Sequence, residues 1–512
     1  MFPGPPVSCG AMAERVLIVG WDGADWDVLD PMLAAGDLPV LAGLIGRGRR
    51  GVSRSCRPSH SWAAWPTFLT GLDPAGHGVF DILEHRPGAS RRMPVSSRSL
   101  LAPTWPMRLS EAGRRVLVVN VPLTYPPLEV NGACIAGGVI PAGSTFSHPA
   151  EIGPQLNWPI NGASWTTFRN RPLDLVADAE RLTRARAEAM RTLLDEQEWD
   201  AACMVFVTPD RIQHCLLEYV HPGHPDHARV ADTPTADRVR DVYRLLDREL
   251  GTLLQRTRED DLVVLMSDHG HQPCTRALNM NRVLEQLGWL RFGRGSAAMQ
   301  LLAWGRVRSM ARVAYDRLGL HGKVAVPTPP LDWAATRAYT SVVSTGEGVS
   351  LALRGREPEG IVAPEDYERV RDELAAALLG YTDPDTGAHP IAAVHRREDV
   401  LFGAHLDRAP DLLLDPAPLY SLTHARAACE RADWLSGDHR PEGIYVKAGA
   451  GVEPVGSDGE EMSLSDFADL IGDAIGAGAG VAAQPYEAAE QPFTDAEQRE
   501  VEERLRGLGY LE

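Results

Sequence analysis

Three short apolar runs in this chain each lead to an aspartate, which is a potential cation ligand. Each run has the length of a buried strand, and helical patterns lie between the runs. The pairs are residues 16–19 with Asp22, residues 201–207 with Asp210, and residues 262–266 with Asp268. Strands that alternate with helices predict a mostly parallel sheet covered on both faces. Ligands of such sheets bind beyond the carboxyl ends of the strands, so we expect the three aspartates to converge on one edge.

Histidines close to two of these aspartates extend the candidate cation site. Asp210 and His214, in TPDRIQH, are four residues apart, so on a helix both side chains project from the same face. Asp268 and His269 precede Gly270, which permits a tight turn, so both side chains can turn toward a common ion. Carboxylates together with imidazoles suit a divalent metal ion, most often zinc.

A third imidazole is available late in the chain. His439 lies in LSGDHRPEGIYVKAG, which we interpret as a polar loop before a strand at residues 444–447. Composition alone does not choose between His439 and three other histidines, which are His424, His405 and His395. Each motif also has an ordinary explanation, such as a helix cap, a surface histidine or an Asp turn. The whole set is nevertheless about what two zinc-like sites with open positions require.

The stretch RPSHSWAAWPTFLTG, residues 57–71, offers several nucleophiles. Its hydroxyl side chains include Ser59, Ser61 and Thr67, and Cys56 directly precedes it. A helix is expected over residues 62–69, for which Ser61 would be an N-cap. That position is compatible with a nucleophile, since a helix N-terminus stabilises an anionic oxygen and a bound phosphate.

The composition argues against several classes of protein. The chain has 512 residues, of which 44% are hydrophobic and 23% charged, as in soluble globular proteins with a large core. A net charge of −18 opposes binding to nucleic acid or anionic lipid. No apolar run reaches the ~18 residues of a membrane span, and no secretion signal is recognised at the start. The seven cysteines are scattered without metal-ligand spacing, which indicates reduced thiols in a cytoplasmic protein.

Taken in order, the motifs resemble the type I phosphodiesterase and nucleotide pyrophosphatase family of the alkaline phosphatase superfamily. That family has a strand ending in Asp, a nucleophile nine residues before Thr-Gly, D-x-x-x-H, S-D-H-G and a late G-x-H. The corresponding residues are Asp22, Ser61 with Thr70-Gly71, Asp210 with His214, Ser267-Asp268-His269-Gly270, and Gly437-Asp438-His439. The resemblance spans roughly residues 15 to 447.

The resemblance implies a role for each matched residue. Ser61 takes the place of the nucleophile, with Ser59 and Thr67 left as a cap and a helix residue. Two divalent ions are implied, most often Zn²⁺ with Mn²⁺ as the alternative. One ion would be bound by Asp22, Asp268, His269 and the Ser61 oxygen, and the other by Asp210, His214 and His439.

Three departures from related patterns bear on activity. Many members have threonine where this chain has Ser61, which supplies the same oxygen. Nucleotide-cleaving members commonly have Asn three residues after the nucleophile, where this chain has Ala64, and this weakens the case for a nucleotide substrate. Cys56 begins a C-x-P-S motif like that of sulfatases, but the Arg that should follow is missing. We therefore expect that Cys56 is not the nucleophile. Trp62 and Trp65 have no assigned role.

The expected fold is α/β, an alkaline-phosphatase-like three-layer sandwich with a mostly parallel central sheet, helices on both faces and an inserted cap. We expect a disordered leader at 1–13, the first part of the catalytic core at 14–272, a cap at 273–345, the second part of the core at 346–470, and a linker with a C-terminal helix at 471–512. The basic residues of 293–330 predict an amphipathic cap helix with a solvated face, or a surface that steers substrate.

The expected function is metal-dependent hydrolysis of phosphoric esters through a phosphoserine on Ser61, with a small phosphorylated substrate and a diester favoured. Two alternatives remain open. One is a phosphomonoesterase, sulfatase-like or phosphonate hydrolase on the same scaffold, since a fold does not fix its substrate. The other is a non-catalytic protein that binds a phosphoryl ligand.

Overall fold

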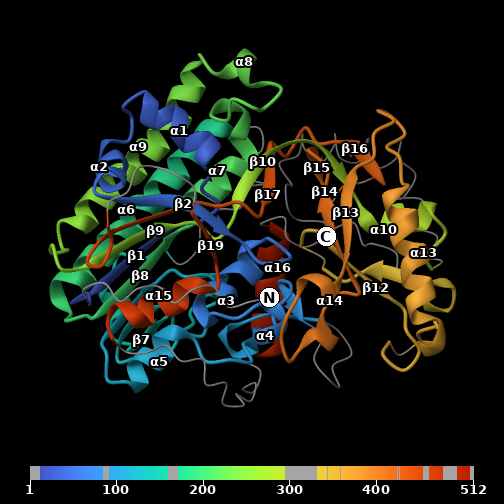
Figure 1. Ribbon diagram of the computed structural model, residues 1–512, viewed down its shortest axis with the longest axis horizontal. Coiled ribbons are helices and arrows are strands. Elements are labelled where there is room, and N and C mark those ends of the chain that lie inside the picture. Colours follow the sequence, from blue (N-terminus) through green and yellow to red (C-terminus); the bar gives the residue numbers. More distant parts are fainter. Residues whose placement is uncertain are drawn as a thin grey trace.

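A nine-stranded sheet forms the centre of the larger part of the molecule (Figure 1). The computed structural model describes residues 12–84, 92–159, 171–293, 331–476 except 343, 358, 424, 426 and 454–459, and 493–507. The sheet order is β19-β2-β18-β9-β1-β8-β5-β6-β7. The strands are β1 (Val16–Trp21), β2 (Gly48–Arg54), β5 (Val116–Val119), β6 (Gly132–Ile135), β7 (Ser147–His148), β8 (Ala201–Phe206), β9 (Leu262–Met266), β18 (Tyr445–Gly449) and β19 (Glu460–Ser463).

The three strands that precede the candidate aspartates lie side by side at the middle of this sheet. β1 pairs in parallel with both β8 and β9, and Val16 lies level with Ala201 and with Leu262. Every residue of the three strands is buried, as is typical of parallel strands covered on both faces. The pairs β5–β6, β5–β8 and β2–β19 are parallel too, whereas the pairs of β18 and of β7 are antiparallel. The expectation of a mostly parallel sheet is therefore confirmed.

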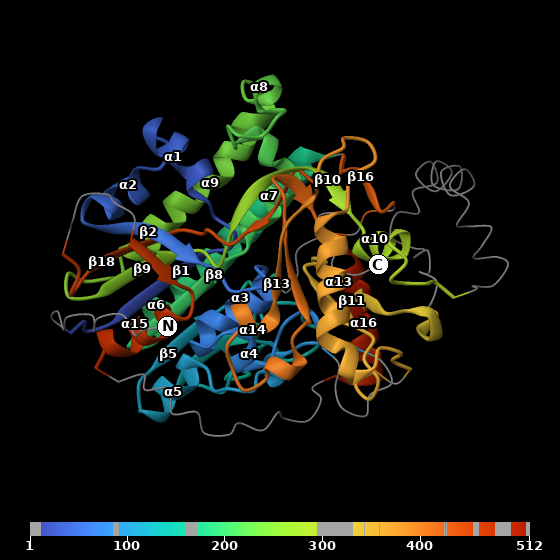
Figure 2. The same ribbon diagram turned by 45° about the vertical axis from the view of Figure 1, so that its right-hand side comes forward.

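Helices cover both faces of the central sheet and complete a three-layer sandwich. Alternate residues of β1 point to opposite faces, with Leu17 in one hydrophobic cluster and Ile18 in another. One face packs against α1 (Trp26–Ala34), α2 (Pro39–Gly46), α6 (Pro172–Glu196) and α9 (Pro234–Leu254), and the other against α3 (Ser61–Thr70), α5 (Trp105–Glu111) and α15 (Asp466–Ala474). Figures 1 and 2 show α1, α2 and α9 above the sheet and α3 and α5 below it.

A second, smaller unit lies beside the central sheet, on the right in Figure 1. Its four-stranded sheet has the order β11-β12-β14-β13 and shares a hydrophobic cluster with two helices. These elements are α10 (Met280–Gln286), β11 (Ala338–Thr340), β12 (Gly348–Leu351), α13 (Tyr367–Leu379), β13 (Ile391–Arg396) and β14 (Leu412–Pro416). The boundary expected between residues 345 and 346 thus falls between two paired strands, because these strands bury their apolar face against α10 and α13 rather than in the core.

A long strand joins the two units. β10 (Gly270–Leu278) begins beside the central sheet and pairs with β15 (Leu419–Ser421), β16 (Cys429–Arg431) and β17 (Gly437–Arg440). His439 therefore lies on a strand and not in the polar loop that we expected, because residues 437–440 pair antiparallel with 270–273. Further helices and short strands of the described residues are β3 (Leu83–Glu84), α4 (Pro74–His77), β4 (Met93–Pro94), α7 (Thr208–Leu216), α8 (His227–Val230) and α14 (Arg397–Val400).

The C-terminal helix is confirmed as α16 (Asp495–Gly507). Thr494 caps it, because the backbone N–H of Glu497 donates to Thr494 Oγ1 at 3.3 Å and the Glu497 side chain accepts from the Thr494 N–H at 2.8 Å. The basic helix expected within 293–330 and most of the expected leader lie outside the described residues.

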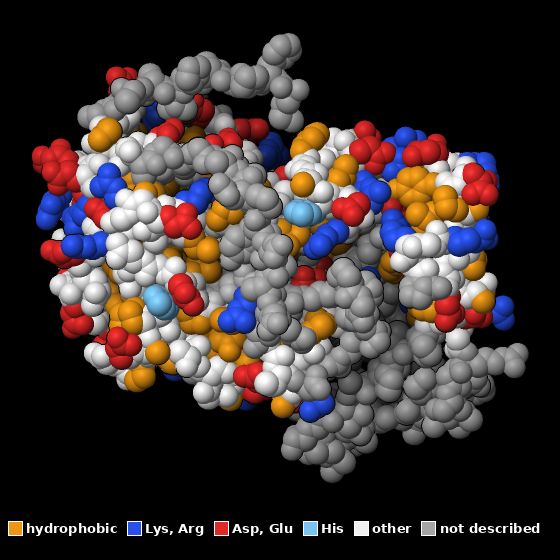
Figure 3. Space-filling model, turned by 90° about the horizontal axis from the view of Figure 1, so that it is seen from below, with side chains coloured by type: hydrophobic (Ala, Val, Ile, Leu, Met, Phe, Trp, Pro, Cys, Tyr) orange, Lys and Arg blue, Asp and Glu red, His pale blue; other side chains and the backbone are white. Residues whose placement is uncertain are grey.

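Two surface properties bear on partners. Within the described residues no single helix is both long and apolar enough to cross a membrane, although α1 and α2 pass that test when they are taken together as a bent pair. On the face seen from below, basic and acidic side chains are interspersed (Figure 3).

Candidate metal centre and nucleophile

The ends of the central strands bring the candidate ligands together. Asp22 directly follows β1, and Asp268 follows β9 by one residue. The Gly23 N–H donates to Asp268 Oδ1 at 3.1 Å and fixes that carboxylate. Asp210, in the first turn of α7, is held by a backbone hydrogen bond from its N–H to the carbonyl of Asp22 at 2.9 Å. The three aspartates therefore converge, as the strand pattern predicted.

The first group of ligands, which we call the Asp22 cluster, consists of Asp22, Asp268 and His269. All three are buried, and their ligand atoms lie within 4.8 Å of one another. Ser61 completes it from the start of α3, since its Oγ lies 3.1 Å from Asp22 Oδ1 and 3.1 Å from His269 Nε2. The hydroxyl that the resemblance assigned as nucleophile thus touches two of the residues assigned to one ion.

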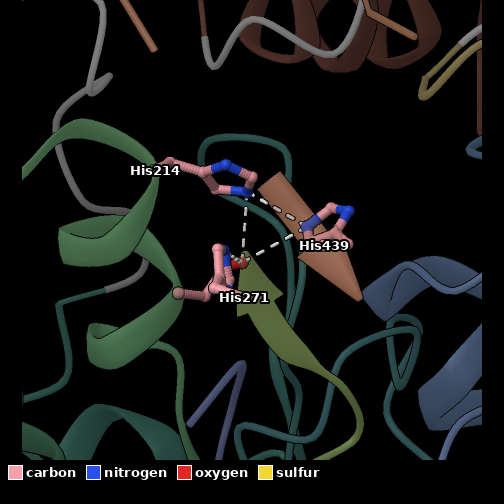
Figure 4. Close-up of side chains that lie close together, drawn as sticks. His214, His271 and His439 are labelled. Atoms are coloured by element: carbon pink, nitrogen blue, oxygen red, sulfur yellow. Dashed lines mark hydrogen bonds and ion pairs between the residues drawn. The ribbon is translucent and has the colours of Figure 1, made fainter. Parts of the chain in front are cut away.

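The second group, the Asp210 cluster, consists of Asp210, His214, His271 and His439. Asp210 and His214 lie one turn apart on α7, with His214 Nε2 3.2 Å from Asp210 Oδ1. His439 Nε2 lies 3.0 Å from His214 Nε2. Figure 4 shows the three histidine rings converging, His214 from the helix and His439 and His271 from strands.

Both clusters fit a divalent cation. Asp210 Oδ1, Asp268 Oδ2 and His271 Nε2 are buried and have no hydrogen-bond partner among the described residues. Such atoms are costly to bury unless something else satisfies them. A cation at each cluster would accept their lone pairs and those of the two facing Nε2 atoms of His214 and His439.

The pKa values of the two carboxyl groups in the Asp22 cluster also indicate a cation site. Burial, together with the charges of Asp268 and Asp210, raises the pKa of Asp22 well above its ordinary value. Burial also raises the pKa of Asp268 to about 8. Two adjacent buried carboxylates resist ionisation unless positive charge is supplied, and a bound cation supplies it.

In the Asp210 cluster one carboxylate faces several imidazoles. Burial favours the neutral form of each group, but the attraction between Asp210 and His214 outweighs it. The pKa of Asp210 is therefore lowered well below its ordinary value, and the pKa of His214 is raised to about 9. Burial lowers the pKa of His439 to about 4 and, with the neighbouring charges, lowers that of His271. His439 and His271 therefore stay neutral, which is the form that binds metals, whereas His214 would release its proton when a cation binds.

The structure brings together every residue that the sequence singled out for the site, which are Asp22, Ser61, Asp210, His214, Asp268, His269 and His439. Sequence reasoning missed His271. Its signal was the second histidine of D-H-G-H, only two residues after His269. Of the other candidates, His395 belongs to neither cluster and pairs with Asp415 at 2.8 Å, and His424 lies outside the described residues.

The other candidate nucleophiles have structural roles. His60 and not Ser59 or Ser61 is the N-cap residue of α3. The hydroxyl of Thr67 donates to the Ala63 carbonyl at 3.0 Å within the helix. Cys56 is buried, and burial raises the pKa of its thiol far above the ordinary value, which leaves it without nucleophilic thiolate.

Trp65 supports the Asp22 cluster from the core. Its indole ring is fully buried between α3 and the sheet, and its Nε1–H donates to Asp22 Oδ2 at 2.9 Å. A partner of this kind orients a metal-binding carboxylate. Trp62, one residue after Ser61, packs instead in a separate apolar cluster with the C-terminal helix.

The comparisons with known proteins agree with this site and define its class. The model of the type I phosphodiesterase / nucleotide pyrophosphatase family matches residues 16–441. The chain is thus a phosphoester hydrolase of the alkaline phosphatase superfamily. Within that superfamily it belongs to the type I phosphodiesterase / nucleotide pyrophosphatase family, whose activity depends on metal ions. Among curated proteins, no match was found.

Solved structures share the fold at low sequence identity. Phosphonoacetate hydrolase from Sinorhizobium meliloti 1021, solved in complex with phosphonoformate, is 17% identical with a TM-score of 0.57, and the match covers 90% of this chain and 96% of that one. Murine ectonucleotide pyrophosphatase / phosphodiesterase 5, solved as an inactive variant in complex with AMP, is 14% identical with a TM-score of 0.51, and the match covers 93% and 97% of the two chains.

Proposed function

We propose that this protein hydrolyses phosphodiesters by transferring the phosphoryl group to Ser61 between two divalent metal ions, Zn²⁺ or Mn²⁺. The observation that carries the proposal is the position of Ser61 Oγ, which lies 3.1 Å from Asp22 Oδ1 and 3.1 Å from His269 Nε2, two residues of the Asp22 cluster. When bound, the two cations supply the positive charge that favours the serine alkoxide and stabilises the leaving oxygen.

The protein's own residues position the reacting groups in two successive steps. Asp22 orients the Ser61 hydroxyl, whose proton passes to solvent as Oγ attacks phosphorus in line. The bond from Oγ to phosphorus forms as the bond to the leaving alkoxide breaks, and that alkoxide takes up a proton from water and leaves as the alcohol. Water then attacks the seryl phosphate ester from the vacated side, gives one proton back to Ser61 Oγ as the Ser61–phosphorus bond breaks, and releases the phosphomonoester. The start of α3 directs backbone N–H groups and its dipole toward the phosphoryl oxygens. Two successive in-line displacements leave the configuration at phosphorus unchanged.

A diester is favoured over a monoester by the charges around Ser61. Arg276 and Arg440 are two cations of the kind that meets a second phosphoryl charge, and each is paired with two carboxylates. The partners are Asp383 and Asp385 for Arg276, and Asp25 and Asp27 for Arg440. The Glu347 carboxylate accepts a hydrogen bond from the Ser59 N–H at 3.1 Å, two residues from the nucleophile. Burial raises the pKa of Glu347 to about 8, so this group adds little negative charge at neutral pH, and the preference for a diester follows from the two paired arginines. A dianionic monoester needs a further cation for its second charge, whereas a monoanionic diester does not.

The test compares hydrolysis of a chromogenic phosphodiester, a phosphomonoester, a sulfate ester and phosphonoacetate by the protein loaded with zinc or manganese. We expect the diester to react fastest, Ser61→Ala to lower its kcat/KM by more than about 10³-fold, and Ser61→Thr to retain measurable activity. Ser59→Ala, two residues away, is the matched control. Diester hydrolysis that persists in Ser61→Ala would overturn the proposed nucleophile.

A further inference from the structure

His271 lies directly across from His439 in a pair of antiparallel strands. In the register of β10 with β17, these two residues are opposite partners. Side chains at opposite positions of an antiparallel pair project from the same face. The two rings accordingly have centroids 5.4 Å apart, and the His214 ring lies 4.8 Å from the His271 ring. His271 thus faces the same point as the two histidines that were assigned to a metal ion.

The hydrogen bonds of His271 fix which of its nitrogens carries the proton. Nδ1 lies 3.1 Å from the carbonyl oxygen of Gly23, which can only accept, so Nδ1 carries the hydrogen. In a neutral imidazole Nε2 then has a free lone pair. That lone pair is buried, has no hydrogen-bond partner among the described residues and lies 3.5 Å from Asp210 Oδ1. His214 is oriented in the same way, with Nδ1 3.0 Å from the Gly437 carbonyl and Nε2 toward the cluster.

Gly23 leaves room for this arrangement. It has a φ of +68°, which favours glycine, and a Cβ there would lie 2.6 Å from the His271 ring. Its carbonyl also accepts from the Gln213 side chain at 2.6 Å, and the His271 backbone N–H donates to Asp25 Oδ2 at 3.1 Å. The ring is therefore held from two sides with its Nε2 pointing into the Asp210 cluster.

We infer that His271 is a fourth protein ligand of the ion bound by Asp210, His214 and His439, an inference that rests on the proposed two-ion site. The two ions then have unlike surroundings. Three imidazoles and one carboxylate surround one ion, whereas two carboxylates, one imidazole and the Ser61 oxygen surround the other. Imidazoles suit zinc and similar ions, while carboxylates suit manganese and magnesium as well. The Asp210 cluster binds its ion more tightly and more selectively for zinc.

Direct evidence comes from the wild-type protein loaded with ¹¹³Cd²⁺ as a probe for zinc. A scalar coupling between one cadmium nucleus and the ring protons of His271, shared with those of His214 and His439, is the expected result. Cadmium that couples to His214 and His439 but not to His271 would overturn the inference. This measurement needs no variant, so it does not depend on whether a substituted protein folds.

Metal titration of variants gives the second readout. His271→Ala should weaken the binding of one zinc ion by at least about tenfold, and leave the other unchanged. His214→Ala is the positive control. His77→Ala is the matched negative control, because His77 is equally buried but bonds to Thr67 outside both clusters. Two zinc ions bound with wild-type affinity in a folded His271→Ala protein would contradict the inference.

The two proposals fail in different ways. If Ser61→Ala keeps its diesterase activity while His271 still couples to cadmium, the nucleophile is wrong and the ligand assignment holds. If the coupling is missing while Ser61→Ala is inactive, only the ligand assignment fails. A wild-type protein that binds no stoichiometric metal after loading would overturn both.

Discussion

The two ligand clusters differ in how the fold builds them. The Asp22 cluster comes from the ends of two paired central strands, β1 and β9, together with the first residue of α3. The Asp210 cluster takes two ligands from α7 and two from the paired strands β10 and β17, which lie outside the central sheet. The first cluster is rich in carboxylates and holds the nucleophile, and the second is rich in imidazoles. In the proposed mechanism, an ion held by the Asp22 cluster would favour the attacking alkoxide, and an ion held by the Asp210 cluster would stabilise the leaving oxygen.

After removal of Ser61 itself, the largest effects should come from removing one carboxylate of each cluster. Asp22→Asn and Asp210→Asn should each lower kcat/KM for a diester by more than about 100-fold. Mutating a residue that only supports a metal ligand already lowers activity or metal affinity by about 10–100-fold, and these two aspartates are the ligands themselves. Each variant should lose one ion per chain, which elemental analysis of the dialysed protein measures. Asp415→Asn, which removes a carboxylate outside both clusters, is the control. Loss of both ions from both variants would show that the clusters are not separate sites.

The next effect concerns Gly23, which contacts both clusters. Gly23→Ala should lower the free energy of unfolding by about 1–3 kcal/mol, because an L-residue is strained at its positive φ. The substitution should also lower the affinity of the protein for both ions. The Gly23 N–H donates a hydrogen bond to Asp268, and the Gly23 carbonyl accepts one from His271. Thermal unfolding with and without zinc separates the two contributions. The comparison is Gly36→Ala, a positive-φ glycine at which an added Cβ meets nothing within 4 Å. If Gly23→Ala lost no more zinc affinity than Gly36→Ala, the bridging role of Gly23 would be wrong.

A smaller and one-sided effect is expected at Trp65. Trp65→Phe keeps an aromatic ring in the core but removes the hydrogen bond to Asp22 Oδ2. We expect activity or metal affinity to fall by about 10–100-fold. The loss of affinity should be confined to the ion bound by the Asp22 cluster. Metal titration of the variant checks this. Equal weakening of both ions would mean that the substitution acts through the fold and not through Asp22.

The smallest effect is expected from substitution of Cys56. This substitution distinguishes the proposed phosphodiesterase from a sulfatase, in which the cysteine would be essential. Cys56→Ala should leave diester hydrolysis within about twofold of wild type, because substitutions away from the reacting groups have small effects. Alkylating reagents should modify Cys56 in the native protein only slowly at pH 8, since burial raises the pKa of its thiol. Mass spectrometry of the alkylated protein measures this rate. Rapid alkylation, or loss of activity in the variant, would reopen the sulfatase alternative.

The central sheet and its aspartates were predictable because their causes are local in the sequence. Buried parallel strands are continuous apolar runs, and each aspartate follows its own run, so Asp22, Asp210 and Asp268 could be placed on one edge. Ser61 and His439 required the family resemblance, because hydroxyls and histidines are too common for composition to choose among them. The native metal and the cytoplasmic location stay predictions.

The missed features depend on contacts between distant residues. The strand β10, GHQPCTRAL, contains a proline and no alternating apolar pattern, and its partner β17 lies about 160 residues later. His271 could not be paired with His439 without that register. The second sheet was missed for the same reason, because β12 and β13 look like strands of the core until their packing against α13 is known.

Crystals of the zinc-loaded protein, with anomalous diffraction recorded at the zinc edge, test the central claim most directly. We predict two anomalous peaks, one about 2.0–2.2 Å from Ser61 Oγ and the ligand atoms of the Asp22 cluster, and the other at a similar distance from those of the Asp210 cluster. A single peak, or two peaks with neither beside Ser61, would contradict the account.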